Sequence, residues 1–418
     1  MTLLIIVYVL FLAIWACAFM SARRYGRIGR RLLAIEPVQA EPAEALPPLS
    51  VVVTAHNAAG NLRRHLPRLL EQDYERFEVI VVDMASTDDT LDVLERLERQ
   101  HPNLSHTRTP ASARDISLPR LALMLGLRAA SSEWVVLTQA CTVPTTSVWL
   151  TRIGQAVSSP QRFLQSPRLQ QPDIVLGTAR YWQQHSTGWS RRMSFHRMWL
   201  TMMHTLHVLS GHSAVSADAS CMVIRRALLT EKGGFTIGQD LRMGAVELLA
   251  AQDATCSNVA LMLTPSAIVE DEAIPQPRSW RNAMVERVEL LRHAGHTSLY
   301  HAALTWQMLL PWAMLIATAI AAGMPFVLPS VLTPSEAETY SAHATIAAIV
   351  AAMLYAVYTI SKHSALSLTA RHLGYGQLPV AWLIWELALA FWHLGARLRH
   401  ARTPRTSFRK SFITQPLS

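Results

Sequence analysis

The sequence is poor in cysteine, with 4 in 418 residues. No two of these cysteines have the spacing of a CxxC pair or of a zinc site, so we expect neither structural zinc nor a disulfide framework. Such cysteine usage fits a reducing cytoplasm. The chain also lacks an internal repeat of solenoid period, which excludes a repeat architecture.

Charged residues are scarce as well, at 16%, whereas hydrophobic residues make up 50% and mean hydropathy is +0.19. This balance is apolar for a soluble protein and predicts several membrane spans. Much of the net charge of +9 lies beside apolar segments, at 23–31 and 397–410. We expect it to set membrane topology and to attract anionic lipid headgroups. Nucleic-acid binding is not expected, because the basic stretches lack a motif and interleaved aromatics.

Long apolar runs lie near both ends of the chain. Residues 3–20 are a continuous run of 18, enough to span a bilayer, and arginines follow it directly. We therefore expect an uncleaved signal anchor with the next residues on the cytoplasmic side. Residues 304–328 and 344–360 are also long enough to span, and the loop between them has no Lys or Arg.

A third C-terminal run, residues 378–394, contains Glu386 and precedes a basic tail. A span here would leave that tail outside, so an interfacial or re-entrant segment is favoured over a span. The predicted organisation is 1–22 signal anchor, 23–48 basic flank and linker, 49–277 cytoplasmic domain, 278–303 membrane-proximal helical segment, 304–398 transmembrane and interfacial helices, and 399–418 basic cytoplasmic tail.

A strand–helix–strand pattern opens the soluble domain. Residues 50–53 and 77–82 are short β-branched runs, and leucines at helical spacing lie between them. Both read as buried parallel strands, and such sheets bind ligands beyond the carboxyl ends of their strands. Further patterns predict strands at 134–137, 173–177 and 259–263, a helix at 118–130, and an apolar helix at 193–209 that is a candidate for lying on the membrane surface.

The blocks SVVVTAHNAAGNL and FEVIVVDMASTDDT resemble the opening of family-2 glycosyltransferases, and the similarity to a membrane-anchored bacterial branch extends to the C-terminus. The resemblance implies an α/β GT-A fold, Rossmann-like with a mostly parallel sheet, flanked by N- and C-terminal transmembrane helices. It implies a nucleotide-sugar donor, a membrane lipid or lipid-linked acceptor, and protein partners in envelope synthesis. It also implies a multi-pass protein of the bacterial inner membrane, with its soluble domain in the cytoplasm.

The resemblance places the nucleotide-sugar at the ends of the first strands. His56 stands where the family usually has tyrosine, and an imidazole could stack on a base. The alternative is a plain strand-to-helix turn with Asn57 as helix cap. Asp83 is retained, whereas Met84 stands where the family has a second acidic residue. Asp83 could contact the base or cap the next helix. The nucleotide-sugar-binding residues implied are Thr54, Ala55, His56, Asn57, Asp83, Arg120, Thr138, Gln139 and Cys141.

The family holds Mg²⁺ or Mn²⁺ with an Asp-Ala-Asp motif, and this chain reads Gln139-Ala140-Cys141 instead. A neutral amide oxygen and a soft sulfur are poor ligands for a hard cation, so we expect no metal site here. Arg120 aligns with a basic residue of the family and could offset diphosphate charge. Its other interpretation is a solvated helix residue.

The family's catalytic carboxylate follows a Gly-Gly-Phe motif, and ungapped alignment places Glu247 there. A shifted alignment selects Asp240 instead, and both could be ordinary helix carboxylates. A membrane-proximal Gln-x-x-Arg-Trp motif is also lost, since its positions fall on Ala283, Glu286 and Arg287. Three hypotheses remain: a transferase with unusual site residues, an inactive transferase-like scaffold in envelope glycan assembly, or a lipid-binding membrane protein without nucleotide binding.

The flanking charges generate a test of topology. The arginines after residue 20 and the uncharged loop before residue 344 predict that residues 49–277 face the cytoplasm. A fluorescent reporter fused at residue 100 should therefore be bright, and a phosphatase fused there should be inactive. The opposite pair of results would show that the topology is inverted.

Overall fold

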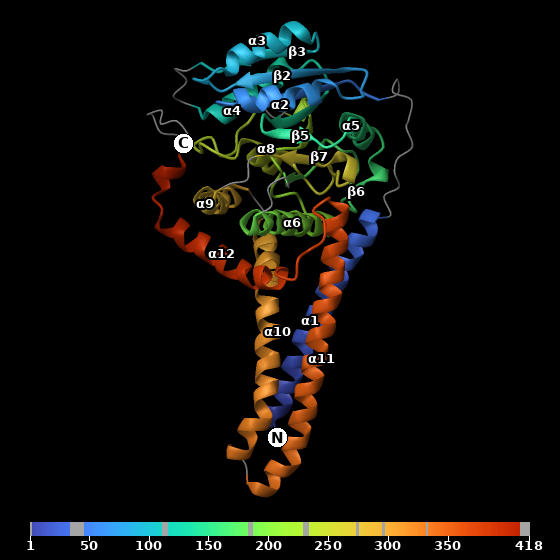
Figure 1. Ribbon diagram of the computed structural model, residues 1–418, viewed down its shortest axis with the longest axis vertical. Coiled ribbons are helices and arrows are strands. Elements are labelled where there is room, and N and C mark those ends of the chain that lie inside the picture. The colour runs from blue at the N-terminus through green and yellow to red at the C-terminus, as the bar shows by residue number, and fades with distance from the viewer. Residues whose placement is uncertain are drawn as a thin grey trace. The chain divides into compact units, whose positions relative to one another are not determined.

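The computed structural model describes residues 2–33, 46–110, 116–182, 187–228, 234–272, 276–294, 297–331 and 333–409. The chain forms two compact units (Figure 1). One combines 1–33 with 301–392, and the other combines 34–300 with 393–418. Helices α10 and α12 run from one unit into the other.

The larger unit is built on an eight-stranded sheet with the order β3-β2-β1-β4-β9-β7-β10-β6. Strands β3, β2, β1 and β4 are parallel, whereas β9 runs antiparallel to both β4 and β7. The strands are β1 (Leu49–Ala55), β2 (Phe77–Asp83), β3 (Leu104–Arg108), β4 (Trp134–Gln139), β6 (Leu164–Gln165), β7 (Ile174–Leu176), β9 (Met222–Arg225) and β10 (Val259–Leu261).

Helices on this sheet form because their leucines and alanines recur at helical spacing. Figure 1 shows α2 (Ala59–Leu70), α3 (Thr90–Gln100) and α4 (Leu118–Ala129) beside the parallel strands. Helix α4 packs on β1 so closely that a Cβ added at Gly126 would meet Val52 Cγ1 at 2.3 Å. Glycine is therefore needed at this contact.

A second, three-stranded sheet has the order β5-β11-β8. Strand β11 pairs antiparallel with β5 and parallel with β8, so this sheet brings together the segments after β4, β7 and β10. The remaining described elements of this unit are β5 (Thr142–Pro144), β8 (Ala179–Tyr181), β11 (Val269–Asp271), α5 (Trp149–Ser158), α6 (Gly188–Leu209), α8 (Ala245–Asp253), α9 (Pro277–His293) and the short 3-10 turns Pro160–Arg162, Pro265–Ala267 and Arg405–Phe408.

The helical unit contains α1 (Thr2–Leu33), most of α10 (Ser298–Val331), α11 (Pro334–His372) and the first part of α12 (Trp382–Arg402). Trp15 of α1, Met314 of α10 and Tyr358 of α11 belong to one buried cluster. Among the described residues, Ser298–Val327 and Ser341–His372 are long and apolar enough to cross a membrane, with mean hydropathy 1.7 and 1.9.

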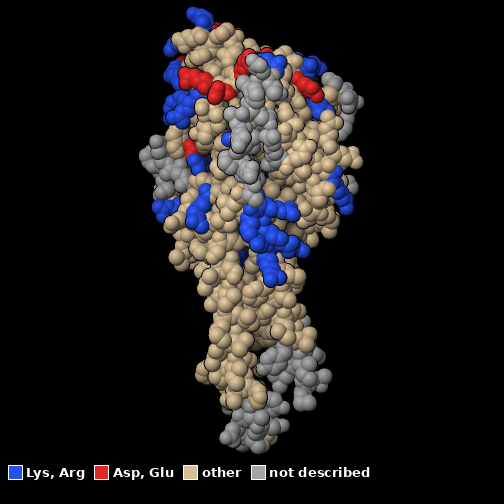
Figure 2. All heavy atoms as spheres, turned by 90° about the vertical axis from the view of Figure 1, so that its right-hand side faces the viewer, with Lys and Arg blue, Asp and Glu red and all other residues tan. Residues whose placement is uncertain are grey.

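Charge is distributed unevenly over the helical unit. Figure 2 shows a largely uncharged surface with Lys and Arg gathered at one level. Glu386 is buried in an ion pair with Lys362 of α11, so the carboxylate that is unusual in this apolar run has a partner inside the same unit. The exposed basic residues that follow the apolar part of α1 are Arg23, Arg24, Arg27, Arg30 and Arg31.

The predicted fold class is confirmed: the domain is α/β with a mainly parallel central sheet. The five predicted strands correspond to β1, β2, β4, β7 and β10. The membrane-surface interpretation of residues 193–209 is wrong, because α6 buries side chains around its circumference. The domain boundaries stay predictions, and residues 34–45 of the predicted linker and 410–418 of the predicted tail lie outside the described residues.

The close contact at Gly126 generates a stability test. Gly126→Ala should destabilise the protein by about 1–3 kcal/mol, because stiff Val52 in the sheet centre must move. Gly60 in α2 has no neighbour within 4 Å of an added Cβ, so Gly60→Ala should be neutral or slightly stabilising. Thermal melting of the detergent-solubilised full chain measures both, and equal melting temperatures for the two variants would contradict the contact.

Candidate functional site

A cavity of about 510 Å³ lies in the larger unit, where the carboxyl ends of β4 and β7 meet α6, α8 and α9. Gln139, the last residue of β4, and Cys141, two residues later, line one part of it. Arg287 and Leu291 of α9 line another part. Ligands of mostly parallel sheets bind beyond the carboxyl ends of the strands, so this cavity is the candidate site.

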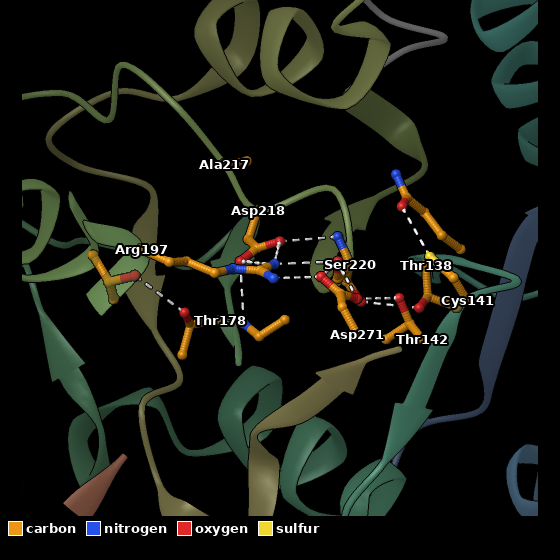
Figure 3. Close-up of polar contacts among 12 residues, drawn as sticks. Thr138, Cys141, Thr142, Thr178, Arg197, Ala217, Asp218, Ser220 and Asp271 are labelled. Atoms are coloured by element: carbon orange, nitrogen blue, oxygen red, sulfur yellow. Dashed lines mark hydrogen bonds and ion pairs between the residues drawn. The ribbon is translucent and has the colours of Figure 1, made fainter. Parts of the chain in front are cut away.

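A polar cluster forms the wall near β4 (Figure 3). Arg197 of α6 contacts both carboxylate oxygens of Asp218 at 2.8 Å and Asp271 Oδ2 at 2.5 Å. Ser220 Oγ donates to Asp271 at 2.8 Å, and Thr142 Oγ1 donates to the same carboxylate at 2.8 Å. One guanidinium thus stands between two carboxylates; hydroxyl groups also donate to Asp271, and backbone N–H groups also donate to Asp218.

Three separate elements bring this cluster together. Arg197 projects from the middle of α6, Asp271 ends β11, and Asp218 precedes β9. The backbone N–H of Ala179 donates to Asp218 at 3.1 Å, and Thr138 Oγ1 donates to the Ser220 carbonyl at 2.9 Å. The cluster therefore ties both sheets to α6.

The residues at the lost metal motif do not fit a hard cation. Burial and the nearby Asp271 carboxylate raise the pKa of the Cys141 thiol to about 12, so this sulfur is protonated near neutral pH. Its Sγ lies 3.6 Å from Gln139 Oε1, as a thiol that donates to the amide. The carboxylates closest in the cluster, Asp218 and Asp271, face Arg197. Within the described ranges, no group of three or more His, Cys, Asp or Glu side chains could hold a metal ion.

Glu247 lies in the first turn of α8 and lines the cavity. Burial raises the pKa of its carboxyl, with Asp218 and Glu286 adding to the rise and Arg287 opposing it. The helix begins after Gly244, whose φ of 70° favours glycine. A Cβ at Gly244 would meet Leu290 Cδ2 of α9 at 2.2 Å, so the start of α8 rests directly on α9.

Asp240, the alternative base, lies elsewhere. Its side chain is 47% exposed and pairs with Arg409 at 3.2 Å, and it does not line the cavity. The structure therefore brings Glu247, and not Asp240, into one cavity with Gln139 and Cys141.

The turns after β1 and β2 are joined by hydrogen bonds. His56 Nδ1 lies 2.8 Å from the Met84 carbonyl, and the Asn57 N–H donates to Ser86 Oγ at 2.8 Å. Asn57 and Ala85 have φ of 47° and 52°. Asn57 Oδ1 accepts from the Thr87 N–H at 2.9 Å and does not cap α2, so the helix-cap alternative for Asn57 is wrong.

Asp83 and Arg120 have structural partners. Asp83 is fully buried, accepts from the Ser86 N–H at 3.2 Å and pairs with Arg108 at 3.1 Å, which closes the turn after β2. Arg120 is buried, donates to the carbonyls of Phe235 and Ile237, and stacks on the Phe235 ring at 3.9 Å. The solvated-helix interpretation of Arg120 is wrong, and its guanidinium holds the 235–237 segment. The predicted nucleotide-side residues that do not line the cavity are Thr54, Ala55, His56, Asn57, Asp83, Arg120 and Thr138.

Sequence reasoning missed Arg197, Asp218 and Asp271. Asp271 had a signal, because it lies in the acidic run Glu270-Asp271-Glu272 at the end of a strand. Arg197 and Asp218 had none, since neither belongs to a motif with recognisable spacing.

The family described as glycosyl transferase family 2 matches residues 50–231. A structurally similar chain is the mannosyltransferase PcManGT from Pyrobaculum calidifontis in complex with GDP-Man and Mn²⁺, at 22% identity and a TM-score of 0.48, covering 87% of this chain and 97% of that one. Residues 1–349 of S. aureus TarS are 14% identical at a TM-score of 0.41, covering 85% and 91%. No curated protein matches the chain.

The residues at Gln139 and Cys141 generate a metal test. Wild type should bind Mn²⁺ no more tightly than the double variant Gln139→Ala with Cys141→Ala, because neither side chain is a good ligand for it. Gln139→Asp with Cys141→Asp should bind Mn²⁺ at least about tenfold more tightly, which is about 1.4 kcal/mol. Electron paramagnetic resonance of free Mn²⁺ measures all three. Tight binding by wild type that the alanine variant loses would show that these residues are ligands.

Proposed function

We propose that the chain, whose residues 50–231 match glycosyl transferase family 2, is a membrane-anchored enzyme of glycosyl transfer. It moves a sugar from a nucleotide-sugar donor to a lipid-linked or cell-envelope glycan acceptor. The observation that carries the proposal is the carboxyl of Glu247, which faces the cavity at the carboxyl ends of the strands.

The proposed step is a single displacement at the anomeric carbon. The acceptor hydroxyl oxygen forms the new bond to this carbon, and the bond from the carbon to the diphosphate oxygen breaks. Glu247 accepts the hydroxyl proton, and the nucleoside diphosphate leaves with the electron pair. Burial supports this role, since a carboxyl with a raised pKa is a stronger base than an ordinary glutamate.

The departing diphosphate needs positive charge or hydrogen-bond donors. A divalent cation does not supply this charge, because Gln139 and the neutral Cys141 thiol do not fit one. Arg197 carries positive charge at the same wall, but Asp218 and Asp271 offset it. These facts favour slow transfer, and they also support the second candidate function, an inactive scaffold in envelope glycan assembly.

Membrane anchoring is part of the proposal. Its support is the pair of apolar helices, Ser298–Val327 and Ser341–His372, and the apolar run at the start of α1 with its exposed arginines. A cytoplasmic domain at the bacterial inner membrane would meet both a soluble nucleotide-sugar and a membrane lipid acceptor.

Nucleotide binding separates the two candidate functions. Calorimetry of the purified full chain with UDP, GDP and CMP should show binding of at least one of them, and EDTA should change that affinity by less than about tenfold. Absence of binding to all three would support the scaffold and contradict the transferase.

Turnover tests the base. Glu247→Gln should lower kcat by about a hundredfold to ten-thousandfold, the usual contribution of a general base, with little change in donor affinity. The rate of wild type should rise with pH through the raised pKa of Glu247, because only the ionised carboxylate accepts a proton, and the variant should lose this rise. Asp240→Asn is the matched control and should behave as wild type. Loss of turnover in Asp240→Asn, with turnover retained in Glu247→Gln, would show that Asp240 is the base.

A further inference from the structure

We propose that the α9 side of the cavity is a subsite for a phosphate group attached to an apolar chain, with Arg287 and His204 as its donors. This inference rests on the proposed function in one respect, since it assigns the subsite to the acceptor. Neither residue belongs to the set that the sequence resemblance selected for donor binding or catalysis.

The first observation is a pair of nitrogen atoms without partners. Arg287 Nε and His204 Nε2 both lie buried with no hydrogen-bond partner, and both residues line the cavity. A buried donor left without an acceptor costs about 1–3 kcal/mol. An anion in the cavity that accepts from both nitrogens would remove this cost.

The second observation is that Tyr300 holds these side chains in place. Arg287 Nη2 lies 3.4 Å from the hydroxyl of Tyr300, whose ring is buried. The His204 ring meets the ring of Tyr300 edge-on, with centroids 6.4 Å apart. The two donors are therefore fixed by a common neighbour before any ligand arrives, which lowers the entropic cost of binding.

The third observation is charge. In the described part of the chain, no carboxylate forms an ion pair with Arg287, whereas Arg197, which lines the same cavity, contacts two. Glu286, the residue before Arg287, pairs with Arg242 at 3.6 Å. Burial and then the nearby Arg287 lower the pKa of His204 to about 3, so this imidazole is neutral, and the tautomer with its proton on Nε2 offers one N–H to the cavity. A guanidinium with this geometry suits the paired oxygens of a phosphate.

The fourth observation is the apolar character of the adjacent walls. Met284, Leu290 and Leu291 of α9 and Leu200 of α6 line the same cavity. A free nucleotide or inorganic phosphate would leave these side chains against water, whereas an apolar chain would cover them. The ligand that fits is thus an amphiphile with a phosphate group.

The position of Glu247 connects this subsite to transfer. Its carboxyl lies close enough to Asp218 and to Arg287 to interact electrostatically with both. A phosphate held at Arg287 would therefore bring the part of the acceptor that is bonded to this phosphate close to Glu247.

Binding of a short lipid phosphate tests the proposal without any nucleotide. The full-length protein in detergent should bind farnesyl phosphate at least about tenfold more tightly than farnesol, its neutral counterpart, and than inorganic phosphate. Arg287→Gln should lower farnesyl phosphate affinity at least tenfold and leave farnesol binding unchanged. His204→Phe, which keeps a ring and removes the nitrogen, should lower it in the same direction.

Two variants control for charge and folding. Arg281→Gln removes an exposed arginine from the same helix and should bind farnesyl phosphate as wild type does. Arg287→Lys keeps the charge and should retain more affinity than Arg287→Gln. Melting temperatures show whether each variant is folded. Equal affinity of folded Arg287→Gln and wild type, or of farnesyl phosphate and farnesol, would overturn the subsite, and equally tight inorganic phosphate would overturn its assignment to an amphiphile.

The outcome is separable from that of the proposed function. Farnesyl phosphate binding that depends on Arg287, in a protein that transfers no sugar, supports the subsite and contradicts the enzyme. Transfer that is unchanged in Arg287→Gln, with no lipid phosphate binding, supports the enzyme and contradicts the subsite.

Discussion

The contact of Arg197 with Asp218 and Asp271 is the constraint on which the site depends. It joins α6 to the segment before β9 and to the last residue of β11, so one guanidinium connects three elements. Removing charges of this kind from water is costly, and it becomes favourable only when the ions satisfy one another. Two carboxylates without Arg197 would repel each other beside Cys141, and the wall near β4 would not keep its shape.

The same contact explains how the domain can retain its fold without the carboxylates of the metal motif. A divalent cation often gathers acidic side chains at such a strand end. Here the guanidinium of Arg197 does this. At the end of β4 stand the neutral amide of Gln139 and the protonated thiol of Cys141. Stability at this wall is thus independent of bound metal, whereas compensation of a ligand's negative charge has to come from elsewhere in the cavity. Fold and chemistry are separable in this domain.

The sequence was sufficient to predict β1 and β2, because their β-branched runs are buried on both faces and end in polar turns. It was insufficient for β9 and for the three-residue strands of the second sheet, whose pairing depends on distant segments. The same reason applies to the site. Glu247 could be selected by counting from a motif, but the importance of Arg197 depends on partners 21 and 74 residues away. The hydrogen bond that joins the turns at Asn57 and Ser86, 29 residues apart, could not be predicted for the same reason.

Gly244 and Leu290 act together as a spacer. Glu247 lies three residues after this contact on α8 and Arg287 three residues before it on α9, so each side chain is about one helical turn, or about 5 Å of rise, from the same point. The spacing of Glu247 and Arg287 along their helices is consequently set by the close packing of Leu290 on Gly244. A ligand that reaches both groups must therefore match the length that this helix contact sets.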